Sequence, residues 1–151
     1  MTSTQMVPRE MSAYLAVKDA RAAIDFYVAA FGAVLDFKLT DPSDGRIGHA
    51  ELVIGQSRFY IADEYPDFGA VGPVTLGGSP VKFHLYVDDT DAFVAQAVSR
   101  GATVLRPSKI EFYGDRSALI ADPFGYSWFV ATKVEEVSPE EMQRRWTASQ
   151  S

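Results

Sequence analysis

The spacing of apolar residues along the chain occurs twice, with a repeat of about seventy residues. In YLAV (14–17) and HLYV (84–87), apolar residues alternate with other side chains, which predicts a strand that is buried on one face. Each stretch leads into apolar residues at helical spacing. These are Ala20, Ala23, Ile24, Tyr27 and Phe31 in the first copy, and Val94, Ala97 and Val98 in the second. The pattern therefore predicts a strand followed by a helix at both places.

Both helical stretches are bounded by residues that suit helix ends. Asp19 and Asp89 precede them, and a carboxylate at this position accepts hydrogen bonds from the free amides of the first turn. Gly32 and Gly101 follow them, where the left-handed backbone conformation favours glycine. We therefore expect each helix to begin after its aspartate and to stop at its glycine.

Three further strand-like runs follow each helix. The first begins with an apolar pair directly after the glycine region, at Val34-Leu35 and at Val104-Leu105. The other runs are HAELVIG (49–55) and SRFYIAD (57–63) in the first half, and DRSALIAD (115–122) and YSWFVAT (126–132) in the second. Each half of the chain therefore has the predicted order βαβββ, and we expect a first module at 8–63 and a second at 81–133.

The segment between the modules and the tail differ from this pattern. Residues 64–80, EYPDFGAVGPVTLGGSP, are rich in glycine and proline, which is typical of a flexible connector or a lid. The tail predicts a C-terminal helix at 138–147, with Ser138 as N-cap and Glu141 completing a capping box. Its apolar residues Met142 and Trp146 lie on one face, so we expect this helix to dock on the body.

Composition narrows the class of protein. Hydrophobic residues make up 47% and charged residues 23% of the chain, which is typical of a soluble globular domain. Fourteen Lys and Arg against twenty Asp and Glu give a net charge of −6, which disfavours a nucleic-acid partner. No apolar run is long enough to span a membrane, the N-terminus lacks the apolar centre of a signal peptide, and cysteine is absent. We expect a cytoplasmic protein with neither a membrane nor a nucleic-acid partner.

The repeated βαβββ order resembles the vicinal oxygen chelate superfamily, which includes glyoxalase I, extradiol dioxygenases and the fosfomycin- and bleomycin-resistance proteins. The resemblance rests on YLAVKDARAAIDFYVAAFGA, HLYVDDTDA and DPFGYSWFVAT, and the longer run YGDRSALIADPFGYSWFVATKVEEVSPEEMQRR resembles the PhnB-like branch. It implies an α+β fold in which two tandem βαβββ modules form a curled open barrel, here with a short C-terminal helix. It also implies a homodimer, which unpaired sheet edges would favour, with the modules paired within one chain or exchanged between two.

The metal-dependent members of that superfamily hold a divalent ion with one ligand from each of four strands. Their motifs fall on Ser12, Glu51, Lys82 and Phe129 in this chain. Only Glu51 is a metal ligand of the usual kind, because Lys82 brings a positive charge and Phe129 has no donor atom. His84 lies on the same predicted face, with His49 nearby. We therefore expect no native metal ion, and Glu51 and His84 as the ligands if one divalent ion is bound.

The remaining residues on the predicted cleft side suggest a small-molecule pocket. Aromatic walls with a few polar groups are typical of such sites. The predicted ligand-binding residues are Tyr14, Glu51, Lys82, His84, Tyr86 and Phe129. We expect a metal-free protein that binds a small aromatic or apolar ligand. The alternatives are a divalent-metal-dependent lyase, isomerase or dioxygenase and, for Glu51, an ion pair with Lys82 or Arg58.

Overall fold

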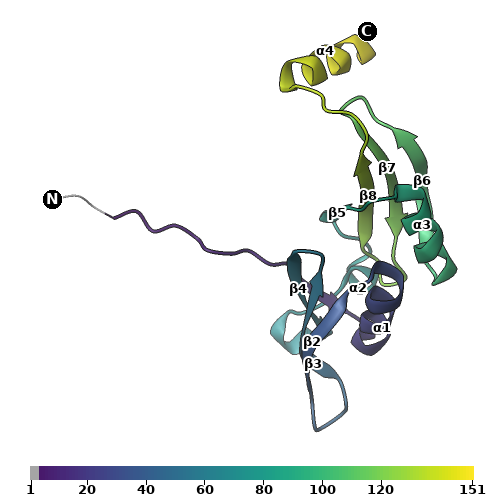
Figure 1. Cartoon of the computed structure of the whole chain (residues 1–151). Coiled ribbons are helices and arrows are strands. Elements are labelled where there is room, and N and C mark those ends of the chain that lie inside the picture. Colours follow the sequence, from purple (N-terminus) through teal and green to yellow (C-terminus); the bar gives the residue numbers. More distant parts are fainter. Residues whose placement is uncertain (1–3) are drawn as a thin grey trace.

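The computed structural model describes residues 4–151 and contains the two modules side by side (Figure 1). The first comprises β1 (Tyr14–Val17), α1 (Ala20–Phe31), β2 (Val34–Thr40), β3 (Ile47–Ile54) and β4 (Ser57–Asp63). The second comprises β5 (Lys82–Tyr86), α3 (Thr90–Ser99), β6 (Thr103–Ile110), β7 (Asp115–Ala121) and β8 (Ser127–Lys133). The expected βαβββ order is therefore confirmed in both halves.

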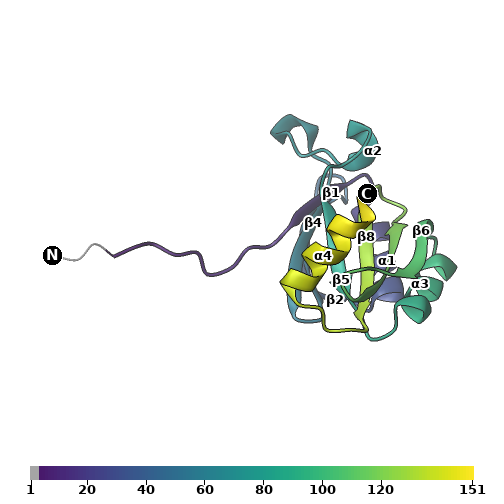
Figure 2. The same ribbon diagram turned by 90° about the horizontal axis from the view of Figure 1, so that it is seen from above.

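Each module folds into one four-stranded sheet with the same topology. The strand orders are β1-β4-β3-β2 and β5-β8-β7-β6, and in each sheet the first strand is parallel to the last while the other pairs are antiparallel. The sheets curl without closing into one barrel, which confirms the α+β fold with two open curled sheets. Two separate views also show the N-terminal segment extending away from the body (Figures 1 and 2).

The helix ends follow the sequence closely. The side chains of Asp19 and Asp89 accept hydrogen bonds from the amides of Ala22 and Ala92, both at 3.0 Å, which confirms the two N-caps. Gly32 is the C-cap of α1 with φ 72°. The second helix ends slightly earlier than expected, because Arg100 is its C-cap and Gly101 follows with φ 116°.

One hydrophobic core joins the modules. The buried face of α1 packs with Phe59 of β4 and Trp128 of β8, and the ring centroids of Phe31 and Trp128 lie 4.9 Å apart. Hydrogen bonds also cross the boundary, from the Tyr27 hydroxyl to Asp122 and from the Tyr126 hydroxyl to the Ala16 carbonyl at 3.1 Å. The two modules are therefore parts of one folded unit.

The connector has more structure than its composition indicates. It contains a 3-10 turn (Pro66–Phe68) and a short helix α2 (Pro73–Leu76). Gly72 lies so close to β1 that a Cβ atom there would be 2.3 Å from the Ala16 carbonyl oxygen, and its amide donates to Glu64 at 2.6 Å. The connector is thus held against β1 at a position that requires a glycine.

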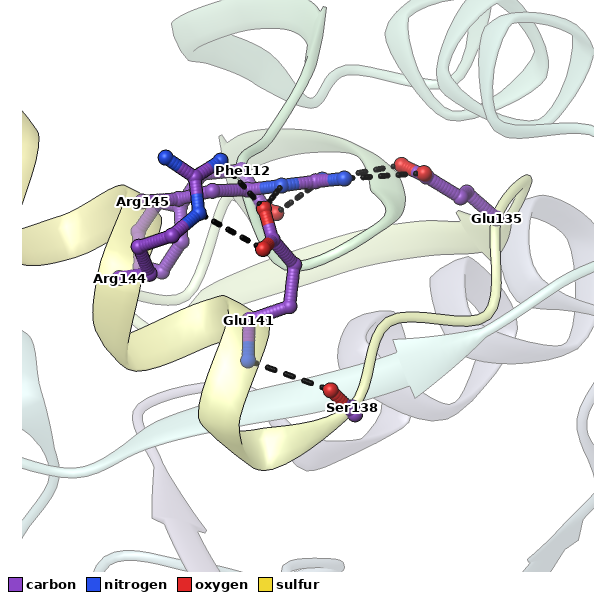
Figure 3. A network of polar contacts seen from close by, with 6 residues as sticks. All are labelled: Phe112, Glu135, Ser138, Glu141, Arg144 and Arg145. Atoms are coloured by element: carbon purple, nitrogen blue, oxygen red, sulfur yellow. Dashed lines mark hydrogen bonds and ion pairs between the residues drawn. The ribbon is translucent and has the colours of Figure 1, made fainter.

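The C-terminal helix α4 (Pro139–Ser149) is present, but its expected docking through apolar residues is wrong. No residue of α4 is buried, and Trp146 remains 51% exposed. Arg145 attaches the helix instead, donating to the Phe112 carbonyl at 2.9 Å and pairing with Glu135 and Glu141 (Figure 3). The expected capping box forms in part: Ser138 accepts from the Glu141 amide, while the Glu141 carboxylate turns toward Arg144 and Arg145.

Among residues 4–151, no helix is both long and apolar enough to cross a membrane.

Candidate functional site

The register of the first sheet places four side chains in a row on the face opposite α1. Tyr14 lies opposite Tyr60, Tyr60 lies opposite Glu51, and Glu51 lies opposite Phe37. Because side chains alternate along a strand, His49 shares this face with Glu51, which is two residues further along β3. The face therefore collects residues from all four strands of the module.

A chain of polar contacts runs along this face. The Tyr14 hydroxyl lies 2.6 Å from Nδ1 of His49, and Nε2 of His49 lies 3.0 Å from Oε2 of Glu51. The other carboxylate oxygen of Glu51 accepts from Arg58 at 3.2 Å. Arg58 also donates to Asp36 at 2.8 Å. Both nitrogens of His49 and both oxygens of Glu51 are therefore engaged, and Arg58 rather than Lys82 pairs with Glu51.

Aromatic rings surround this polar chain. The ring centroid of His49 lies 5.3 Å from those of Tyr14 and Tyr60, and 5.8 Å from that of Phe37. Tyr14 is 55% exposed and Phe37 42% exposed, whereas His49 and Glu51 are partly covered. The pKa of Tyr14 is raised by desolvation and by the negative charge of Glu51, so its hydroxyl stays protonated at neutral pH.

The face of the second sheet carries the other predicted ligand-binding residues. Lys82, His84 and Tyr86 are exposed on β5, and Phe129 lies opposite His84 on β8. The His84 ring centroid lies 4.7 Å from that of Tyr86 and 6.1 Å from that of Phe129. These residues form an aromatic group around one histidine.

The buried carboxylate of Asp115 accepts a hydrogen bond from the Tyr86 hydroxyl. The Tyr86 hydroxyl donates to Asp115 at 2.8 Å, and this hydrogen bond, with desolvation and the charge of Asp115, raises the pKa of Tyr86. Asp115 is almost fully buried, and within residues 4–151 its second oxygen has no hydrogen-bond partner, although the Lys133 ammonium lies 3.8 Å away. The Tyr86 hydroxyl is thus fixed in orientation.

The six predicted residues fall into two groups on separate sheets. Tyr14 and Glu51 belong to the face of the first sheet, and the other four belong to the face of the second. Within residues 4–151, the hydrogen bonds, ion pairs and ring contacts of these side chains are made with residues of the same sheet. One chain therefore brings them to two open faces rather than to one closed cleft.

One hollow lies at the boundary of the modules, and a second lies within the first module beside the N-terminal segment. A cavity of about 170 Å³ lies between the modules, lined by Ala13, Ile54, Ser57, Arg58, Phe59, Phe83, His84, Leu85 and Trp128. A wider hollow of about 440 Å³ adjoins the β3–β4 turn and is lined by Glu10, Met11 and Ser12 and by residues of that turn. The lining of the wider hollow does not include Tyr14, His49 or Glu51.

The donor set does not fit a divalent metal. Among the residues that the structure describes, no group of three or more His, Asp or Glu side chains is arranged to hold an ion. Glu51 already bonds to His49 and Arg58, and His84 lies among aromatic rings of the other sheet.

The main residue that the sequence analysis left out of the predicted site is His49. The sequence indicates it only as a neighbour of the predicted ligands, yet it lies at the centre of the polar chain. Its spacing of two residues from Glu51 on one strand places both side chains on one face, which is a usable signal. Its contact with Tyr14 depends on two strand pairings, β1 with β4 and β4 with β3, which the spacing does not specify.

Comparison with known proteins identifies the family. A family model described as Glyoxalase/Bleomycin resistance protein/Dioxygenase superfamily matches residues 10–130. The uncharacterized protein Rv0887c of Mycobacterium tuberculosis is 40% identical over 136 residues, which cover 88% of this chain and 79% of that protein. The uncharacterized protein At5g48480 of Arabidopsis thaliana is 31% identical over 126 residues, which cover 78% of this chain and 74% of that protein.

Solved structures agree with this assignment. The crystal structure of the At5g48480 product superposes with a TM-score of 0.67 at 29% identity, covering 83% of this chain and 99% of that one. TioX from Micromonospora superposes with a TM-score of 0.62 at 26% identity, covering 84% of this chain and all of that one. The family resemblance inferred from the motifs is thereby confirmed: the chain belongs to the glyoxalase/bleomycin resistance protein/dioxygenase superfamily.

Proposed function

We propose that this protein binds a small aromatic or largely apolar molecule against the open faces of its sheets, without a resident metal ion. The observation that carries the proposal is the first-sheet face, where exposed Tyr14 and Phe37 flank a polar chain whose members are already hydrogen-bonded. Exposed rings around a few fixed polar groups are suited to an aromatic ligand, since the rings supply contact area and the polar groups supply orientation.

A second copy of the chain would complete the site. The predicted residues lie on two faces, and Tyr14 and Tyr86 are 55% and 58% exposed on them. Large exposed rings on adjoining faces favour association, because covering them removes apolar surface from water. We therefore propose a homodimer in which the facing sheets of two chains enclose the ligand.

We also propose that the protein belongs to the PhnB-like branch, on the basis of the motif at 113–145.

Metal content and ligand-induced stabilisation test the proposal together. Untagged protein purified without chelator is expected to contain only traces of zinc, iron, manganese or nickel by elemental mass spectrometry. A panel of small aromatic compounds is then screened for a rise in melting temperature, which a ligand of the native state produces. About one equivalent of metal per chain would overturn the metal-free proposal in favour of a metal-dependent lyase, isomerase or dioxygenase.

Substitutions locate the binding face. Phe37→Ala removes an exposed ring from the first sheet and is expected to weaken binding by about tenfold, the effect of losing roughly 1.4 kcal/mol of ring contact. Phe68→Ala is the control, because Phe68 is 85% exposed in the connector and belongs to neither sheet. Equal effects of both substitutions, or of neither, would contradict the proposed face.

Light scattering tests the dimer. A mass of twice the 16.6 kDa chain at micromolar concentration is expected. A clean monomer would contradict the homodimer and leave the two faces as separate surfaces.

A further inference from the structure

In the hydrogen-bond chain on the first sheet, the geometry determines which groups donate and which accept. Nε2 of His49 faces the Glu51 carboxylate at 3.0 Å, so this nitrogen carries the proton and donates. In a neutral imidazole the other nitrogen is then an acceptor, so the Tyr14 hydroxyl donates to Nδ1 at 2.6 Å. The phenolic oxygen of Tyr14 keeps its lone pairs free on the exposed side, where it can accept a hydrogen bond.

Charged groups lie close to the imidazole of His49. The Glu51 carboxylate accepts the hydrogen bond of Nε2, as the carboxylate does in a catalytic triad, and so orients the ring. The remaining titratable and charged groups around His49 are Tyr14 on β1 and Tyr60 on β4, and around Glu51 they are Arg58 and, beyond it, Asp36. Arg58 is shared between two carboxylates, so the cluster keeps one negative charge in excess near the ring.

The internal duplication provides a comparison within the same chain. In the first sheet Tyr14 lies opposite Tyr60, which lies opposite Glu51. In the second sheet His84 lies opposite Phe129, which lies opposite Leu119. The second-module counterparts of Tyr14, His49 and Glu51 are therefore His84, Ser117 and Leu119. The same fold is built there without such a chain, so the fold does not require it.

We infer that Tyr14, His49 and Glu51 form a proton-accepting relay for a small aromatic hydroxyl compound. The ligand hydroxyl donates to the Tyr14 oxygen, its O–H bond breaks as a new O–H bond forms on Tyr14, and the original Tyr14 proton moves to Nδ1 of His49. The products are a phenolate ion hydrogen-bonded to neutral Tyr14 and an imidazolium paired with Glu51. Tyr14 contacts the ligand, while His49 and Glu51 act through it. This inference rests on the proposed ligand binding and adds the class of ligand and the chemical step.

The first test asks which ring nitrogen of His49 carries the proton, in the ligand-free protein as it exists in solution. The chain contains two histidines, so nitrogen NMR of labelled protein resolves four ring nitrogens. Nδ1 of His49 is expected to be unprotonated with Nε2 protonated. Protonation of Nδ1 in the neutral ring would overturn the relay whatever the ligand.

The proton step is tested with 4-nitrophenol, whose phenolate is yellow. The dye is titrated one pH unit below its solution pKa, where about a tenth of the free dye is ionised. Binding is measured separately by equilibrium dialysis. Most of the bound dye is expected to be phenolate, a five-fold or greater rise in the ionised fraction, and His49→Gln and Tyr14→Phe are expected to abolish the rise.

Tyr65→Phe is the matched control. The Tyr65 hydroxyl bonds to Asp41 on the side of β3 that Gly48 faces, opposite the side of His49. Its loss is expected to leave the ionised fraction unchanged. Dye that binds but stays un-ionised would overturn the relay and leave the binding function intact. Failure of the dye to bind would overturn this ligand class, and failure of every aromatic compound in the stability screen would overturn the proposed function as well.

Discussion

Asp122 is the residue at which hydrogen bonds from both modules meet. One carboxylate oxygen accepts from the amides of Phe124 and Tyr126 at 2.9 and 3.0 Å, and thereby forms the turn of the DPFG motif. The other accepts from the Tyr27 hydroxyl and from the Trp128 indole, the latter at 2.9 Å. Burial and the adjacent Asp122 charge raise the pKa of Tyr27 well above its ordinary value, so Tyr27 is a donor at every relevant pH.

Asp122→Asn is expected to destabilise the protein by about 2–3 kcal/mol, because one buried site that accepted from two donors then bears an amide N–H₂ group. Denaturant unfolding measures the loss. Asp25→Asn on the exposed face of α1 is the control, expected within about 0.5 kcal/mol of the unaltered protein. Equal stabilities of the two variants would show that Asp122 does not act as a buried acceptor.

At the candidate site, alternation predicts which side chains of one strand share a face, but not which strands meet or which side chains touch. Tyr14 and Glu51 follow from alternation along their strands. Their link through His49 requires the registers of β1 with β4 and of β4 with β3, which local spacing does not determine. The choice of Arg58 over Lys82 as the partner of Glu51 likewise depends on neighbouring strands within one sheet.

Helix α4 is stabilised by ionised groups within it. Arg144 and Arg145 hydrogen-bond to Glu141 and lower its pKa to about 2. A carboxyl whose pKa is lowered in the folded state stabilises it above its ordinary pKa of 4.5, and this contribution is lost as the pH falls toward 2. The amides of α4 are therefore expected to lose exchange protection between pH 4.5 and 2 before those of α1, as measured by hydrogen exchange. Loss of protection in α1 first would contradict this order.

Substitution of two neighbouring arginines tests the attachment of α4 to the rest of the chain separately from the stability of the helix itself. Arg145→Gln removes the bonds to Phe112, Glu135 and Glu141 and is expected to speed amide exchange in α4 by about tenfold at neutral pH. Arg144→Gln removes only the contact with Glu141 inside the helix, so a much smaller effect is expected. Similar rates in both variants would mean that Arg145 does not hold the helix in place.

The existence of the elements follows from the sequence better than their packing does. The caps at Asp19, Asp89 and Gly32 act locally, so the residues that form them also reveal them. Met142 and Trp146 lie on one face of α4, as their spacing predicts, but no residue of the helix is buried and Trp146 stays exposed. The connector forms a helical turn at Pro73 because Glu64 and β1 hold it, and composition alone contains no sign of these contacts.

At the scale of the molecule, the shared core predicts that the two modules unfold together. Trp128 of the second module packs against Tyr27 and Phe31 of the first, at ring-centroid distances of 5.6 and 4.9 Å. Gln96 of α3 also donates to the Ala30 carbonyl of α1 at 2.9 Å. Unfolding either module would expose this apolar surface of the other, so the partly folded state is disfavoured.

Fluorescence from buried Trp128 and far-ultraviolet circular dichroism are therefore expected to give one denaturant midpoint and one slope. Trp146→Phe removes the exposed second tryptophan, so the fluorescence then reports the module boundary alone. If fluorescence changed at lower denaturant than circular dichroism, the boundary would separate before the modules unfold. The duplicated units would then be two domains in contact, and the hydrogen bond from Tyr27 to Asp122 would not couple them.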